Sequence, residues 1–349
     1  MSDTADVAIT TSNVILIITC IVGNFFVCVV VMKNRDMRTP INYLLVNLAT
    51  ADICYATFII PTIILNHNVG HPKGIFGTFL CAVITGGSFG GSFAWIGGIA
   101  SMFTLLVIAF ERYFAVVHPY GNRGKLTLQR LKVIIPGIWI LALIDNIPSF
   151  MRRSRFVEED SSTPCIFLLS KESIRKCRTV YLSINCLVMI LLVLIYSRIV
   201  YTLWFKQSGN AVLTNQGVLR LRKRVTLMVV TVSAILVISW GADSILHLLD
   251  EHAAGSVKLS PLAIPIAHTM LLFNSAINPF AYALLNQRFR KKMRQMIRSG
   301  SFATRIGAMF MRRGESQDND TGHTTGSIQM TQQDQLRERA ATISRENVL

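Results

Sequence analysis

Charged side chains within long apolar runs are the residues of this sequence most suited to chemistry. The run from Ser92 to Phe110 is uncharged and mostly apolar, and Glu111-Arg112-Tyr113 follows it directly. A carboxylate and a guanidinium at the end of a membrane helix are unfavourable singly, so we expect them to pair. Because a partner can break such a pair, the motif predicts a switch. An ordinary interfacial ion pair is the alternative.

A second charge, Asp243, has neighbours that recur at helical spacing. Trp240, Asp243, Ser244 and His247 follow one another in steps of three and four residues, so they share one helix face. A carboxylate on such a face favours a cationic ligand. The alternative is that Asp243 bonds His247 or His268 and fastens two helices together.

The elements that position these residues are membrane helices. The chain has 349 residues, of which 51% are hydrophobic and 15% charged, and its mean hydropathy of +0.46 is too high for a soluble domain. Long apolar runs without alternation favour helices over a barrel. The net charge of +16 fits basic loops that face the cytoplasm and anionic lipid, so no nucleic-acid partner is expected.

Seven apolar segments are long enough to cross a membrane. They are predicted over about residues 14–32, 40–65, 74–110, 133–151, 179–197, 225–249 and 259–286. The third is longer than one span needs, and its tandem Gly86-Gly87-Ser88-Phe89-Gly90-Gly91-Ser92-Phe93 predicts a weakened or bent helix start. We therefore expect an all-α membrane protein, a seven-transmembrane-helix bundle.

The predicted organisation has four parts. An extracellular amino terminus covers residues 1–13, and the bundle covers 14–286. Apolar and basic side chains alternate over 287–299, which predicts a short amphipathic eighth helix on the anionic inner leaflet. Residues 300–349 are polar and rich in Ser and Thr, which predicts a disordered cytoplasmic tail. Basic loops after the first, third and fifth spans place the amino terminus outside, although the loop after the fourth span breaks the contrast.

Polar and aromatic residues recur along these segments in a fixed order. They are Gly23-Asn24, Asn47-Leu48-Ala49-Thr50-Ala51-Asp52, Glu111-Arg112-Tyr113, Trp139, Tyr196, Trp240, Asn274-Ser275-Ala276-Ile277-Asn278-Pro279-Phe280-Ala281-Tyr282 and Phe289. In this order they closely resemble the rhodopsin-like (class A) family of G-protein-coupled receptors, over roughly residues 14–298. The resemblance implies a plasma-membrane receptor that binds an extracellular ligand, neuropeptide-like or otherwise small and soluble, and activates heterotrimeric G proteins.

The resemblance also implies roles for single residues at the inner end of the bundle. Arg112 matches the residue that leaves its acidic neighbour on activation and helps to seat the G protein. Tyr196 and Tyr282 match its partners in the active state. The remaining matches are Tyr113 in the Glu-Arg-Tyr motif, Pro119-Tyr120 as a docking feature for the G protein, and Asn278-Pro279 as a place where the seventh span bends.

A sodium site is implied in the middle of the bundle. Asp52 is the single charge in its apolar segment, and the matching set is Asp52, Ser101, Asn274 and Asn278. A carboxylate with neutral oxygens is suitable chemistry for a hard cation. The alternative for Asp52 is a protonated, hydrogen-bonded carboxyl group.

The implied ligand pocket lies at the outer end of the bundle. Trp240 matches the marker of the pocket floor, and the pocket residues are Ala94, Trp240, Asp243, His247 and His268. Since only about a dozen residues precede the first span, we expect the ligand to bind within the bundle and outer loops. The family also pairs a cysteine at the Cys81 position with one in the long outer loop; Cys165 is the preferred partner and Cys177 the competitor.

The sequence departs from the family pattern at several positions. Glu111 stands where Asp is commoner, while Val188 and Ala242 stand where the family has prolines. The missing proline after Trp240 puts the kink of the sixth span in doubt, although Gly241 is a partial replacement.

Two rival functions fit less well. A visual pigment is suggested by the opsin-like stretch Arg38-Thr39-Pro40-Ile41-Asn42-Tyr43. However, Leu272 occupies the position at which an opsin has its retinal-binding lysine, so no retinal is expected. A transporter would show a chain of ionisable groups or an internal repeat of spans, and neither is apparent. No catalytic pattern is present, so an enzyme is not expected. Expected partners besides ligand and G protein are membrane lipid, and receptor kinases and arrestin at the Ser/Thr-rich tail.

Overall fold

Seven long helices dominate the part of the chain that the structure describes. This computed structural model describes residues 3–61, 63, 75, 92–118, 126–150, 154–156, 165–167, 171–206, 216–252, 260–285 and 287–298. The long helices are α1 (Asp3–Lys33), α2 (Pro40–Phe58), α5 (Ser92–Val117), α6 (Leu128–Phe150), α7 (Lys171–Tyr201), α8 (Gln216–His252) and α9 (Ala263–Leu285). The predicted fold class, an all-α bundle of seven helices, is confirmed.

Four shorter elements complete the described regions. They are the 3₁₀ turn η1 (Arg35–Met37), the π-helical turn η4 (Thr202–Lys206), the strand pair β1 (Ser154–Phe156) and β2 (Cys165–Phe167), and the helix α10 (Gln287–Arg298). The strands are antiparallel, with Ser154 opposite Phe167 and Phe156 opposite Cys165. This strand pair lies within 152–178, which the sequence predicted only as a long polar loop.

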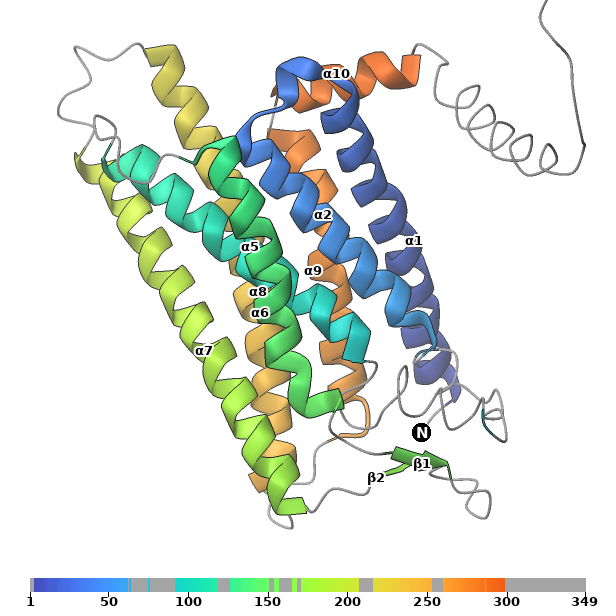
Figure 1. The fold of residues 1–349 in the computed structure, drawn as a ribbon. Helices are drawn as coiled ribbons and strands as arrows, with labels where there is room; N and C mark the ends of the chain where they lie inside the picture. Colours follow the sequence, from blue (N-terminus) through green and yellow to red (C-terminus); the bar gives the residue numbers. More distant parts are fainter. Residues whose placement is uncertain are drawn as a thin grey trace, which may run out of the picture. The chain divides into compact units, whose positions relative to one another are not determined.

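The chain divides into two compact units, residues 1–295 and 296–349. The seven long helices lie in the first unit, where α5 is the central one: it packs against α2, α6, α7 and α8 (Figure 1). On the other side of α2, α1 packs against both α2 and α9, and α9 in turn packs against α8. Every long helix therefore packs against at least one other helix, which determines the side that it turns toward the bundle interior.

A glycine allows α2 and α5 to approach closely. A Cβ atom at Gly97 would lie 2.7 Å from both the Ala51 carbonyl oxygen and the Tyr55 amide nitrogen. No side chain fits at that distance, so only glycine permits this packing. The buried core around it includes Leu48 and Ile99, which are fully enclosed.

The outward faces carry the apolar residues that a bilayer would cover. Ile15 and Ile18 of α1, and Leu187 and Ile190 of α7, are large and exposed. Within the described residues, four helical stretches are long and apolar enough to cross a membrane, namely Thr4–Lys33, Phe93–Val117, Thr179–Phe205 and Val229–Leu249. Exposed apolar faces on such helices are the expected surface of a protein whose solvent is lipid.

Several helix boundaries differ from the prediction. The segment 1–13 was predicted as an amino terminus ahead of the bundle, yet α1 already begins at Asp3. Its polar residues are accommodated because Thr10, Thr11 and Ser12 each donate a side-chain hydrogen bond to the carbonyl four residues earlier. The helix α8 begins at Gln216 rather than near 225, so it includes the basic stretch 220–224, and it continues through Asp243 without interruption.

Two helices end or begin well inside the apolar segments predicted for them, which were 40–65 and 74–110. The helix α2 ends at Phe58, before Pro61, and α5 begins at Ser92, directly after Gly91. The predicted amphipathic eighth helix corresponds to α10, in which Phe289 is buried and Lys292 Nζ lies 3.2 Å from Asp36 Oδ1. The tandem repeat at 86–91 and the tail at 300–349 lie outside the described residues.

Candidate functional site

A buried polar cluster joins α2, α5 and α9 around Asp52. Ser101 Oγ donates to Asp52 Oδ1 at 2.9 Å, and Asn278 Nδ2 donates to Asp52 Oδ2 at 2.6 Å. Asp52 and Asn278 are completely buried. Each carboxylate oxygen of Asp52 therefore receives a hydrogen bond from a different helix, which ties three helices to one side chain.

The oxygens near Asp52 form the set that a hard cation prefers. The side-chain carbonyl oxygens of Asn274 and Asn278 are buried, and neither has a hydrogen-bond partner among the described residues. Ser101 and Asn274, together with Ser275, line a small cavity that extends to Trp240. One carboxylate, a hydroxyl and two amide oxygens are suitable ligands for a sodium ion. Hydrogen bonds join Asp52 to Ser101 and Asn278, and Asn274 lines the same small cavity as Ser101.

Three further interhelical hydrogen bonds involve residues of the recurring polar and aromatic set. Asn47 Nδ2 donates to Thr104 Oγ1 at 2.8 Å, while Trp139 Nε1 donates to Asn47 Oδ1 at 3.0 Å. At the other side, Asn24 Nδ2 donates to the Ser275 carbonyl at 3.1 Å. These contacts fasten α1 to α9 and α2 to α5 and α6, and so they hold the Asp52 cluster in place.

The carboxy-terminal end of α5 carries the predicted ion pair. Arg112 Nε donates to Glu111 Oε2, and both side chains are only partly exposed, 16% for Arg112 and 18% for Glu111. The Tyr113 ring packs edge-on against Phe114 and His118. The charges of Glu111 and Arg112 are thus matched to each other in this conformation.

The remaining residues of the predicted switch are only partly described. Tyr196 on α7 and Tyr282 on α9 are buried, and the Tyr282 hydroxyl has no hydrogen-bond partner among the described residues. Pro279 lies inside α9 and packs against Gly23 of α1. A Cβ atom added at Gly23 would lie 2.9 Å from Pro279 Cγ, so this contact leaves no room for a side chain. Pro119 and Tyr120 lie outside the described residues.

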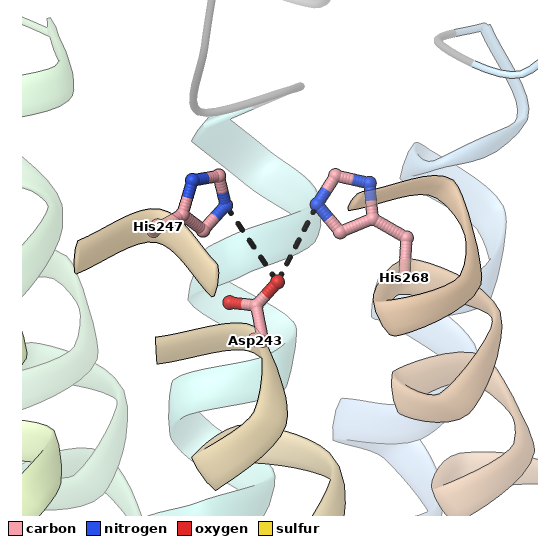
Figure 2. A group of neighbouring side chains, drawn as sticks. All are labelled: Asp243, His247 and His268. Carbon is pink, nitrogen blue, oxygen red and sulfur yellow. Dashed lines mark ion pairs between the residues drawn. The ribbon is translucent and has the colours of Figure 1, made fainter. Parts of the chain in front are cut away.

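A compact cluster of one carboxylate and two imidazoles bridges α8 and α9. Asp243 Oδ1 lies 3.6 Å from His247 Nε2 and 3.6 Å from His268 Nε2. Figure 2 shows the Asp243 carboxylate between the two imidazole rings. His247 belongs to α8, as Asp243 does, and His268 lies opposite on α9. Asp243 and His247 therefore lie on one face of α8, as predicted, and this face is directed toward His268.

An aromatic layer supports this cluster. Trp95 packs edge-on against Trp240, with ring centroids 5.6 Å apart, and against His268 at 5.9 Å. Tyr55 contacts Trp95 from α2 at 6.4 Å. A Cβ atom at Gly98 would lie 3.0 Å from the Trp240 ring, so the glycine leaves room for the indole.

The sequence did not single out Trp95. It identified the preceding residue, Ala94, as the pocket position because of the resemblance, and Ala94 is completely buried. Trp95 is the residue that contacts both Trp240 and His268. Its partners come from other helices, so no local pattern in the sequence identifies it.

The predicted disulfide falls partly outside the described residues. Cys81 lies outside the described residues, and Cys165 is described only as the first residue of β2. The Cys81–Cys165 link and its Cys177 competitor stay predictions. Leu272, at the position where an opsin has its retinal lysine, is buried in α9.

Comparison with known proteins decides the family. A family model described as 7 transmembrane receptor (rhodopsin family) matches residues 23–282. The chain belongs to this family. The predicted function, a G-protein-coupled receptor for an extracellular ligand, is confirmed, and this receptor is a multi-pass protein of the plasma membrane.

Individual relatives of this receptor are themselves receptors. It is 31% identical over 315 residues to neuropeptide FF receptor 1 of Rattus norvegicus. This match covers 82% of this chain and 69% of the relative. It is 28% identical over 312 residues to the pyroglutamylated RF-amide peptide receptor of Rattus norvegicus, with the same coverage of both chains. The allatostatin-A receptor of Bombyx mori is 28% identical over 284 residues, covering 79% of this chain and 76% of the relative.

Proposed function

We propose that this receptor binds an extracellular neuropeptide with a cationic group, and that Asp243 is the anchor for that group. The observation that carries the proposal is the position of the Asp243 carboxylate, which lies between two imidazoles above the Trp95–Trp240 layer. Buried carboxylates are rare unless they have a partner, and two histidines at 3.6 Å are partners that a stronger cation can replace.

The relatives support a peptide ligand of this kind. The names of two of them contain neuropeptide FF and RF-amide peptide. In the one-letter code RF is arginine followed by phenylalanine, so an RF-amide peptide carries a guanidinium group beside an aromatic ring. A carboxylate next to aromatic side chains suits both groups, since guanidinium binds carboxylate in a bidentate manner and also stacks on aromatic rings.

The position of the cluster within the bundle supports an outer pocket. Thr269, the residue after His268, donates a hydrogen bond of 2.9 Å to Asn13 near the beginning of α1. The cluster is therefore close to the end of the bundle at which the chain begins, and the strand pair lies at that end too (Figure 1). We assign this end to the outside, with the carboxy terminus in the cytoplasm, because the basic stretch 220–224 and α10 belong to the opposite end.

The inner end is proposed as the surface for the heterotrimeric G protein. Arg112, Tyr113, Pro119 and Tyr120 would contact it, with Tyr196, Asn278, Pro279 and Tyr282 as the residues that rearrange. The helix α10 carries basic residues and would contact anionic lipid of the inner leaflet. Receptor kinases and arrestin are proposed partners of the Ser/Thr-rich segment 300–349.

A sodium ion is proposed as an allosteric cofactor at the Asp52 cluster. Asp52, Ser101, Asn274 and Asn278 would supply the oxygens, and the charge would come from the Asp52 carboxylate. In this arrangement both carboxylate oxygens accept hydrogen bonds, so sodium would share Asp52 with the donors Ser101 and Asn278.

The test is a panel of short amidated peptides that end in Arg-Phe-amide, applied to cells that express the receptor, with G-protein activation as the readout. Each peptide has a twin in which citrulline replaces arginine, because citrulline keeps the shape and removes the charge. We expect activation by at least one arginine peptide and a tenfold or larger loss of potency with its twin. Receptor with Arg112→Ala at matched surface level is the negative control. Activation by a neutral small molecule alone, with no response to any peptide, would contradict the proposal.

A further inference from the structure

We propose that Asp243, His247 and His268 form a binding site for a divalent transition-metal ion, with Zn²⁺ as the best fit. The bound ion would bridge α8 and α9 directly. The proposal goes beyond the binding of a peptide and does not depend on it, because the three donors belong to the receptor and are already together without any ligand.

The spacing of the three donor atoms matches a metal site better than a hydrogen-bonded fastener. One donor atom from each residue lies within 4.8 Å of the other two, and Asp243 Oδ1 is 3.6 Å from each histidine Nε2. A charge-assisted hydrogen bond would be about 2.7–2.9 Å long. Two ligands on a tetrahedral zinc with bonds near 2.1 Å are roughly 3.4 Å apart. The two distances from Asp243 Oδ1 to the histidine nitrogens are thus close to an edge of such a tetrahedron, and the third separation is at most 4.8 Å.

The backbone positions these donors without requiring loops. Asp243 and His247 are four residues apart on α8, so they share one helix face, and His268 stands opposite on α9 (Figure 2). The His247 and His268 rings are 6.1 Å apart between centroids, and the Trp95 ring supports His268 from α5 at 5.9 Å. Since α8 and α9 pack directly against each other, the site is preformed on rigid elements.

The donor set selects the kind of ion. Two imidazole nitrogens and one carboxylate oxygen form a common zinc ligand set, which leaves the fourth position for water or another ligand. Imidazole favours zinc and its neighbours among the transition metals, whereas sodium, calcium and magnesium prefer oxygen. The cluster is therefore chemically distinct from the all-oxygen site around Asp52, and the two sites should not compete for one ion.

His268 is the most exposed of the three residues. The exposed fraction of the side chain is 4% for Asp243, 12% for His247 and 29% for His268. An ion could enter past His268 and then be enclosed by the other two donors. Because it would hold two helices together, we expect a bound ion to stabilise the folded receptor by an amount that grows with the logarithm of the ion concentration above the dissociation constant.

The experiment is a ZnCl₂ titration of purified, full-length, peptide-free receptor in nanodiscs, after treatment with a chelator, with the melting temperature as readout. We expect Zn²⁺ to raise the melting temperature, and MgCl₂ at equal ionic strength to leave it unchanged. His247→Ala and His268→Ala should each weaken the zinc effect at least tenfold in midpoint concentration. The matched control is His118→Ala, directly after the end of α5, which should keep the full zinc response.

Two outcomes would overturn the proposal. One is the absence of a zinc response in the wild-type receptor, and the other is an undiminished response in both His247→Ala and His268→Ala. Each variant is compared with and without zinc, so a variant that is less stable from the start remains informative. If a variant does not fold, visible absorption of Co²⁺ bound to the wild-type receptor provides the second measurement. A tetrahedral signature that zinc displaces supports the site, and its absence contradicts it. The failure of peptide activation would leave these results unaffected.

Discussion

Asn278 donates a hydrogen bond of 2.6 Å to Asp52, although the two residues are 226 positions apart. The contact joins α9 to α2 directly beside the proline of α9, Pro279. A rearrangement of α9 at this proline would therefore change what surrounds the Asp52 carboxylate. The Asn278 side chain thus joins the mid-bundle carboxylate to the part of α9 that contains Pro279.

The first prediction follows from that coupling and concerns sodium. A cation that binds only the inactive arrangement must shift the equilibrium away from the active one, so raising sodium should lower agonist affinity. Asp52→Asn should abolish the dependence, since it removes the charge and keeps the shape. The measurement is agonist competition binding in NaCl against a bulky organic chloride at equal ionic strength. Asp36→Asn, an exposed carboxylate on η1, is the control that should keep the shift, and an unchanged shift in Asp52→Asn would refute the site.

The second prediction concerns Glu111 and Arg112. If their pair restrains the inactive state, Glu111→Gln should raise ligand-free signalling by releasing the Arg112 guanidinium. Arg112→Ala should instead reduce agonist-stimulated signalling without blocking delivery to the surface. Basal G-protein activation at matched surface expression measures both. Equal basal activity in wild type and Glu111→Gln would leave an ordinary interfacial ion pair as the better description.

The third prediction concerns the close packing of α2 and α5. Gly97→Ala places a methyl group 2.7 Å from the Ala51 carbonyl oxygen, so the helices must separate. Overpacking of this kind costs about 1–3 kcal/mol, and we expect a lower melting temperature of the purified receptor. Gly137→Ala on α6 is the matched control, because a Cβ atom there meets nothing within 4 Å. It should leave the melting temperature equal or slightly higher, given that alanine is the better helix former. Equal melting temperatures for Gly97→Ala and wild type would contradict this packing.

The sequence predicted this fold well because apolar length and helical spacing are local signals. Asp243 and His247 could be placed on one face from their four-residue step alone. The convergence of Asp52 and Asn278 was implied only by the family resemblance, since periodicity does not specify which helices are neighbours. The strands β1 and β2 have three residues each, which is too short for an alternating pattern to be recognised.

Other features could not be predicted from the sequence because they depend on contacts that it does not specify. Trp95 carries no charge, and its role depends on the partners Trp240 and His268 from two other helices. The early start of α1 at Asp3 depends on hydroxyl groups that bond back to the helix, as Thr10 and Thr11 do. The sequence prediction marked only the apolar run, which begins near residue 14, and so placed the boundary about ten residues too late.

The fourth prediction is the Cys81–Cys165 disulfide implied by the family. A bond of this kind forms in the oxidising environment that an outer loop meets. Peptide mapping under non-reducing conditions should recover Cys81 and Cys165 in one linked fragment. Cys165→Ser should lower surface expression, while Cys186→Ser should not, because Cys186 is a free and exposed cysteine of α7. A Cys81–Cys177 link, or two free thiols, would refute this pairing.

The last prediction distinguishes two roles of Asp243 that its position allows equally, namely fastening two helices and anchoring the ligand. Its carboxylate lies 3.6 Å from both His247 and His268, so it is placed to fasten α8 to α9 and also to anchor a cationic ligand. Both roles make the loss of the side chain harmful, and stability therefore does not distinguish them. Asp243→Asn keeps the shape and the hydrogen-bonding capacity and removes the charge. If the carboxylate binds an arginine of the ligand, the lost contact of ~1.4 kcal/mol weakens binding about tenfold, and the citrulline twin of the peptide loses nothing further on the mutant. The measurement is a double-mutant cycle of agonist potency at matched surface expression. Equal potency of the arginine peptide on wild type and Asp243→Asn would show that Asp243 is a fastener and that the anchor of the ligand lies elsewhere.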